Sequence, residues 1–208
     1  METLKSLPKD LETTYDQILE RIEKREMPSA NIILQWLVLG MHPLLQEELC
    51  IVVTFNASSG NFDSSLALAH PDDVIQLCSS LVIKGANNKV QLAHASVKEY
   101  LLDKPTKIGL PDIASGHAFI AYCCLKYLMQ YGMQAHKREI SLLGYSDQLW
   151  PKHYKLSNEN QSLQDITITF FQCEDGAFER WKDEYDELWL LDHYVNVTPL
   201  HYAAFFGM

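Results

Sequence analysis

The sequence predicts a mainly α-helical protein that carries one small β-hairpin. Apolar residues recur at spacings of three and four along most of the 208 residues, which is the period of a helix with one buried face. The pattern changes to that of short strands only around residues 81–93. The composition, with 47% hydrophobic and 21% charged residues, provides enough apolar surface for one or two compact domains.

Three helices are expected before residue 55. The first carries its apolar residues on one face and is bounded by Pro8 and Pro28. The second fits residues 29–39 and ends at Gly40, and the third fits residues 45–54. The apolar face of the first helix consists of Leu7, Leu11, Tyr15, Ile18, Leu19 and Ile22.

A loop, a short helix and a hairpin follow. Residues 56–65 are rich in Asn, Ser and Gly, which is typical of a loop, and a short helix is expected over residues 71–79. Residues 81–84 and 89–93 predict two strands. Residues 85–88 between them supply the Gly and Asn residues that tolerate the positive φ of a hairpin turn.

A further helix closes this part of the chain. Ser96 is its expected N-cap residue, and Glu99 three residues later would complete a capping box. Three helices, a loop, a helix, a two-stranded wing and a closing helix are the element order of a winged helix-turn-helix. We therefore expect a winged-helix domain over residues 1–105.

The rest of the chain is expected to be a helical linker over residues 106–194. Its acidic stretch, residues 174–192, holds eight acidic residues against two basic ones and is interpreted as a solvated helix face. The expected elements are helices over residues 112–131, 162–171 and 178–191, a connector over 137–145 and an aromatic turn over 150–154.

The last residues match the opening of an ankyrin repeat, T-P-L-H-x-A. In this motif the helix begins at the Thr-Pro pair and the histidine forms a local hydrogen bond. The small apolar residues pack on a neighbouring repeat. An ankyrin repeat has about 33 residues, so the sequence predicts a truncated repeat over 195–208 with Leu200, Phe205 and Phe206 uncovered. The motif residues are Thr198, Pro199, Leu200, His201, Ala203 and Ala204.

Five stretches, in this order, make the chain similar to fungal NACHT–ankyrin proteins, which are NLR-like signal-transduction ATPases. They are residues 7–19, 33–37, 43–49, 92–101 and 149–153, which resemble LPxxLxxTYxxIL, ILQWL, RPLxxEEL, LxHxSVKEYL and WPxH. The fourth contains the expected winged-helix signature, His94, Ser96, Val97, Lys98, Glu99, Tyr100 and Leu101.

The resemblance implies a winged helix of the type also described in GPI inositol-deacylase-like proteins. It implies a non-catalytic, cytoplasmic segment that packs on a nucleotide-binding module and links that module to an ankyrin sensor array, in cis or on a neighbouring chain. No G-x-x-x-x-G-K-[ST] phosphate loop occurs in the sequence, so we expect no cofactor and a fragment, a split gene model or a decayed copy.

The composition and motifs disfavour two other functions. A DNA-associated winged helix is disfavoured because the net charge is -10 and residues 71–81, the expected recognition helix, contain no Lys or Arg. A hydrolase remnant is disfavoured because His94 and Ser96 fit a helix cap and no G-x-S-x-G motif occurs. Scattered histidines and five cysteines without C-x-x-C spacing predict no metal site, and apolar runs of about eight residues predict no membrane span.

Overall fold

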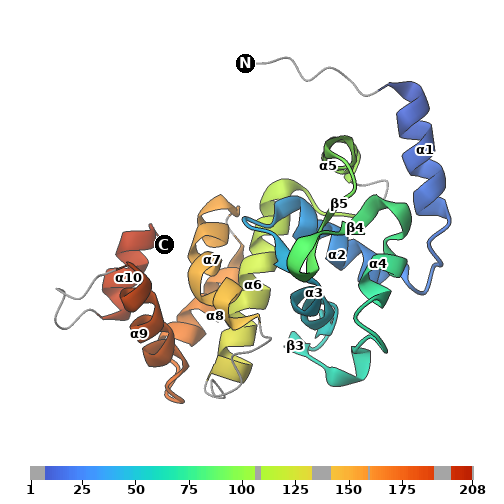
Figure 1. Ribbon diagram of the computed structural model, residues 1–208. Helices are drawn as coiled ribbons and strands as arrows, with labels where there is room; N and C mark the ends of the chain where they lie inside the picture. The colour runs from blue at the N-terminus through green and yellow to red at the C-terminus, as the bar shows by residue number, and fades with distance from the viewer. Residues whose placement is uncertain (1–7, 106–108, 133–141, 159, 190–197, 208) are drawn as a thin grey trace. The chain divides into compact units, whose positions relative to one another are not determined.

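The computed structural model describes residues 8–105, 109–132, 142–158, 160–189 and 198–207 (Figure 1). The chain divides into two compact units. The first comprises residues 1–53 and 67–113, and the second comprises residues 54–66 and 114–208. The predicted mainly helical fold class is confirmed.

The first unit has the elements of a winged helix. Its helices surround α2, which is apolar on most of its surface because it lies at the centre, where Ile33, Leu34 and Trp36 are fully buried. The elements are α1 (Lys9–Glu20), α2 (Met27–Leu39), β1 (Leu44–Leu45), α3 (Gln46–Val52), α4 (Asp73–Leu77), η2 (Ser79–Leu81), β4 (Val82–Lys84), η3 (Ala86–Asn88), β5 (Lys89–Leu92) and α5 (Ala95–Asp103).

The predicted wing is confirmed, because β4 and β5 pair antiparallel with Val82 opposite Leu92. Asn87 and Asn88 in the connecting turn have φ values of 56° and 59°, the left-handed conformation that Asn tolerates. A third strand, β1, was not predicted; it pairs with the other edge of β5 in the order β1-β5-β4.

Four expected helix boundaries in this unit were wrong. Helix α2 begins at Met27 rather than at residue 29, with Pro28 in its first turn. Helix α3 begins at Gln46 because the Glu48 carboxylate accepts the backbone N–H of Leu45 at 2.7 Å, which leaves Leu45 in β1. Helix α4 spans only Asp73–Leu77, since Ser79 adopts φ 53° and cannot continue it. Helix α5 begins at Ala95, with His94 rather than Ser96 as its N-cap.

The second unit consists of a small hairpin, one 3-10 helix and five α-helices among the described residues. The segment expected to be a loop over residues 56–65 is instead the hairpin, in which Phe55 pairs with Phe62 and Asn56 with Asn61. The elements are β2 (Phe55–Asn56), β3 (Asn61–Phe62), η1 (Ser64–Leu66), α6 (Ile113–Tyr131), α7 (Leu143–Leu156), α8 (Gln161–Phe171), α9 (Ala177–Trp189) and α10 (Pro199–Phe206).

The aromatic turn expected at residues 150–154 lies inside helix α7, with Pro151 in the helix interior. A proline lacks the N–H that would bond the carbonyl four residues earlier, which here is that of Asp147. The indole N–H of Trp181 donates to this carbonyl at 2.9 Å and so replaces the lost bond. The expected connector over 137–145 falls partly outside the described residues, and α7 has already begun at Leu143.

Aromatic rings form the core of the second unit. Trp150 and Trp181 lie 5.4 Å apart between ring centroids and are fully buried. Tyr202 and Phe206 bring α10 onto Trp181, at 5.3 and 6.3 Å. The expectation that Phe206 is uncovered was therefore wrong, because only 4% of its surface is exposed.

No helix within the described part of the chain is long and apolar enough to cross a membrane.

Candidate functional site

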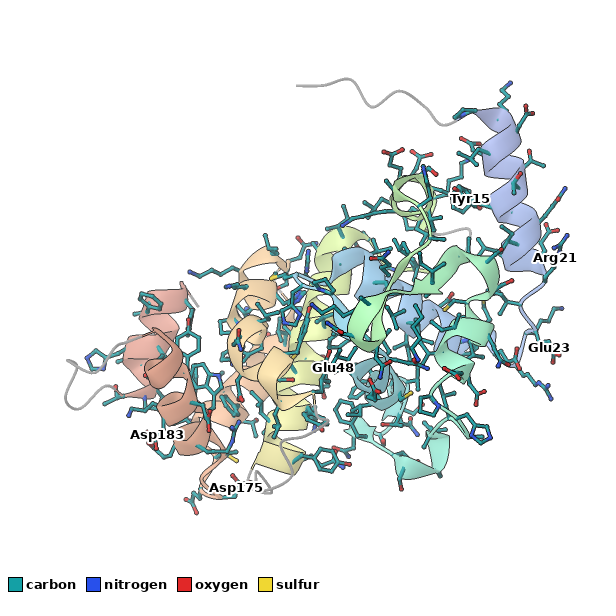
Figure 2. All side chains as sticks on the ribbon, viewed as in Figure 1. Tyr15, Arg21, Glu23, Glu48, Asp175 and Asp183 are labelled. Atoms are coloured by element: carbon teal, nitrogen blue, oxygen red, sulfur yellow. The ribbon has the colours of Figure 1, made fainter. Side chains whose placement is uncertain are left out.

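A row of polar side chains joins α1 to α5 and contains three residues of the expected winged-helix signature. The partners recur at spacings of three and four on α1 and of four on α5, which places them on one face of each helix. Figure 2 labels Tyr15 between the two helices. We call this row the α1–α5 clasp; it consists of Glu12, Tyr15, Asp16, His94, Ser96, Tyr100 and Lys104.

Ser96 is the centre of the clasp. Its backbone N–H donates to Nδ1 of His94 at 3.2 Å, so this nitrogen is the unprotonated one of the imidazole ring. The Ser96 hydroxyl lies 2.6 Å from the same nitrogen and therefore donates to it. The hydroxyl of Tyr15, 2.7 Å away, then donates to Ser96 Oγ. The chain of donors thus runs from Tyr15 through Ser96 to His94.

The other two contacts of the clasp involve charges. The Tyr100 hydroxyl donates to the Asp16 carboxylate, and the Lys104 ammonium donates to the Glu12 carboxylate. Burial raises the pKa of Tyr100, and the hydrogen bond and charge of Asp16 raise it further, so Tyr100 remains a donor at neutral pH. The hydrogen bond to Glu12 raises the pKa of Lys104.

The remaining signature residues lie outside the clasp. Val97 and Leu101 are buried in the core of the first unit, whereas Lys98 and Glu99 are exposed. The expected capping box between Ser96 and Glu99 is not formed, because His94 caps the helix. Ser96 is 7% exposed, so its hydroxyl points into the contact between the helices.

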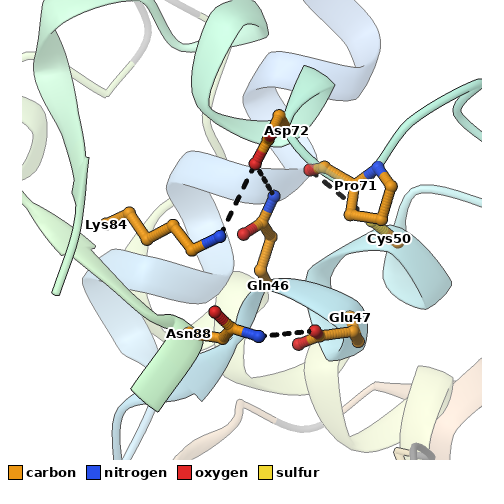
Figure 3. Close-up of polar contacts among 7 residues, drawn as sticks. All are labelled: Gln46, Glu47, Cys50, Pro71, Asp72, Lys84 and Asn88. Atoms are coloured by element: carbon orange, nitrogen blue, oxygen red, sulfur yellow. Dashed lines mark hydrogen bonds and ion pairs between the residues drawn. The ribbon is translucent and has the colours of Figure 1, made fainter. Parts of the chain in front are cut away.

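A second polar cluster fastens the wing to α3 and α4 (Figure 3). The carboxylate of Asp72 accepts from the Gln46 amide at 2.8 Å and lies 3.6 Å from the ammonium of Lys84. These two partners lower the pKa of Asp72, the Gln46 hydrogen bond more than the Lys84 charge. The amide of Asn88 in the wing turn donates to the Glu47 carboxylate at 3.0 Å.

The residues of the expected ankyrin motif form helix α10. The imidazole of His201 accepts the backbone N–H of Thr198 at 3.2 Å, and its Nδ1 lies 2.8 Å from the Thr198 hydroxyl. Pro199 is the first helical residue. On the same helix Leu200 is 77% exposed, Ala204 is exposed and Ala203 is half-buried.

A buried histidine pair in the second unit was not foreseen from the sequence. Nδ1 of His117 on α6 lies 2.8 Å from Nδ1 of His153 on α7, and Nε2 of His153 lies 2.8 Å from the hydroxyl of Tyr145. One of the two facing Nδ1 atoms must carry a proton and the other must accept it. The only sequence signal was His153 itself, in the stretch that resembles WPxH. Within the described residues, no group of three or more His, Cys, Asp or Glu side chains could hold a metal ion.

A comparison with known protein families finds a match for the winged-helix part of the chain. Residues 15–115 match the family model described as GPI inositol-deacylase, winged helix domain. This part of the chain has the elements of a winged helix and is similar to that domain. The match begins at Tyr15 and includes every residue of the clasp except Glu12.

One relative extends the similarity beyond the winged helix. The chain is 29% identical over 198 residues to azaphilone pigments biosynthesis cluster protein L from Monascus ruber. The similarity covers 86% of this chain but 42% of the relative, so the chain spans about two fifths of that protein's length. No solved structure matches the chain.

Proposed function

We propose that the chain is a non-catalytic, cytoplasmic regulatory segment of a NACHT–ankyrin type signalling ATPase. In this proposal the winged helix packs on a nucleotide-binding module, and the helices that follow link the module to an ankyrin array. The chain itself binds no cofactor, and its partners are those two regions, in cis or on a neighbouring chain. The observation that carries the proposal is the winged helix of the GPI inositol-deacylase type over residues 15–115.

The wing face supports a protein partner rather than DNA. A winged helix that reads DNA brings cations to phosphates and polar side chains to base edges. Here the short helix α4 opens with Asp72 and Asp73, and the Lys84 ammonium in the wing is paired with Asp72. A phosphate approaching this face meets carboxylates, so its approach is opposed by charge repulsion.

The polar contacts of Ser96 support a structural use of the His94–Ser96 pair. A nucleophilic serine needs a base that takes its proton and an approach for substrate. The Nδ1 atom of His94 already accepts the backbone N–H of Ser96, and the serine hydroxyl is buried against Tyr15. This geometry fits a clasp between helices, and the hydrolase alternative gains no support from it.

The end of helix α10 supports continuation into a helical array. Two large apolar side chains, Leu200 and Phe205, are 77% and 66% exposed on this helix. The opposite face is anchored by Tyr202 and Phe206 on the aromatic core of the second unit. A helix with one face packed and an apolar second face fits the first helix of stacked repeats, which bury such faces against one another.

The test is the ATP turnover of a NACHT module with and without this chain fused behind it. The module is taken from a fungal NACHT–ankyrin protein, and a globular domain of similar size in place of the chain is the control. We expect the chain to lower the turnover rate and the control domain to leave it unchanged. Equal turnover in both fusions would contradict the proposal.

A further inference from the structure

We infer that the hairpin of β2 and β3 couples the two units of the chain, so that loosening it in the second unit destabilises α3 and α4 in the first. This inference concerns the fold and does not depend on the proposed function. It rests on how the hairpin is connected and on how it is held.

The hairpin belongs to the second unit, but the chain on both sides of it belongs to the first. Helix α3 ends at Val52, and the N–H of its C-cap, Val53, donates to the Leu49 carbonyl at 3.2 Å. The next residue, Thr54, already accepts the N–H of Asp63 across the hairpin at 2.8 Å. No linker separates the end of α3 from the hairpin, so a displaced hairpin pulls directly on the last turn of α3.

The hairpin is held by the side chains of α6. The amide of Gln130 bonds both backbone groups of Phe62: its oxygen accepts the N–H and its nitrogen donates to the carbonyl, both at 3.1 Å. Phe62 also packs edge-to-face on Tyr127 at 5.1 Å. In the other strand, Phe55 packs on Phe119 at 5.6 Å. Both hairpin phenylalanines are buried.

The turn of the hairpin is fixed as well. Gly60 has φ 65°, its N–H donates to the Asn56 carbonyl at 2.8 Å, and a Cβ at this position would lie 3.1 Å from the Tyr122 hydroxyl. The Asn56 side chain accepts the N–H of Ser58 at 2.9 Å. A hairpin with a fixed turn and two fixed strands moves as one piece rather than absorbing a displacement by bending.

The chain therefore passes between the two units three times, after Val53, after Leu66 and after Ile113. A single passage acts as a hinge and allows two units to open independently. Two of the three passages here bound residues 54–66, the segment that contains the hairpin. The attachment of the hairpin to α6 thus controls whether the two units open separately or together.

The test is hydrogen–deuterium exchange of the full chain, read by mass spectrometry on peptides from α3, α4 and residues 54–66. The variant Gln130→Ala removes both hydrogen bonds to Phe62 at an exposed position. Loss of two such bonds should speed exchange of the hairpin and of α3 and α4 by about fivefold or more. The control is Gln164→Ala, which changes a half-buried glutamine of α8 whose side chain makes no hydrogen bond to the hairpin among the described residues and should leave all three peptides unchanged.

A second variant, Phe62→Leu, perturbs the same attachment through packing rather than hydrogen bonding. Both variants must show the circular dichroism spectrum of the wild-type protein, because general unfolding would also speed exchange in α3 and α4. Faster exchange in α3 and α4 in either variant supports the coupling. Unchanged exchange of α3 and α4 in both variants overturns it, whether or not the hairpin itself exchanges faster.

Discussion

The hydrogen bonds of the α1–α5 clasp run in one direction, from Tyr15 through Ser96 to His94, so the effect of removing each group can be predicted. Tyr15→Phe removes the donor to Ser96 Oγ but leaves Ser96 bonded to His94. One intramolecular hydrogen bond contributes a net 0.5–1.5 kcal/mol in typical proteins, so we expect the free energy of unfolding to fall by about 1 kcal/mol. Ser96→Ala removes the acceptor instead and leaves the Tyr15 hydroxyl without its partner in a buried contact. We expect that variant to lose about 1–3 kcal/mol.

The double variant decides whether the contact itself is responsible. Once Tyr15 is phenylalanine, Ser96→Ala no longer strands a hydroxyl, so the two losses should not add. We expect an interaction energy of at least about 0.5 kcal/mol in urea unfolding experiments, the range found for residues in contact. Tyr154→Phe is the control, because this half-buried tyrosine of the second unit has no hydrogen-bond partner for its hydroxyl within the described residues. Strictly additive losses, or a Tyr15→Phe loss no larger than that of the control, would refute the donor chain.

Three further predictions concern Trp181, Glu48 and binding to DNA. Trp181→Phe removes the indole N–H that serves the Asp147 carbonyl beside Pro151, together with part of a fully buried ring system, so we expect a loss of at least about 1–3 kcal/mol in unfolding free energy; an unchanged urea midpoint would contradict the compensation of the proline. Burial raises the pKa of Glu48 above 4.5, so the folded state favours its protonated form and gains stability as pH falls through the raised pKa. The stability of the natural protein relative to Glu48→Gln, measured by urea unfolding at pH 7 and pH 4, should therefore rise on acidification, and a fall would show that the Leu45 hydrogen bond outweighs burial. The full chain should not shift the mobility of a DNA duplex in a gel at low salt. A mobility shift would support the alternative of a DNA-associated winged helix.

The sequence located both helices of the clasp but not their contact. Residues 7–19 and 92–101 stood out as separate stretches, because helical periodicity reports which face of a helix is buried and not which helix covers it. Tyr15 and Ser96, 81 positions apart, are joined only by the tertiary fold. The expected cap at Ser96 was wrong for the same reason: the side chain that prefers a cap position is used toward α1, and the imidazole of His94 caps the helix instead.

Long-range contacts also explain the two elements that were missed in the second unit. Pro151 normally ends a helix, and only the distant indole of Trp181 makes its place inside α7 acceptable. The strands of the hairpin are two residues each, too short to show a period of two. They are stabilised by Gln130 and the aromatic side chains of α6 rather than by their own propensities. The wing was predictable because its Gly and Asn turn is local in sequence.

The most direct test of the proposed role is isothermal titration calorimetry, in which the purified chain is titrated into a purified NACHT module. If the winged helix packs on the module, we expect saturable one-to-one binding that survives the Gln164→Ala control. Because a specific protein contact of ordinary size gives dissociation constants well below about 0.1 mM, binding should be complete at that concentration. Absence of binding at that concentration, with the module loaded with ADP and with ATP in turn, would contradict the central claim.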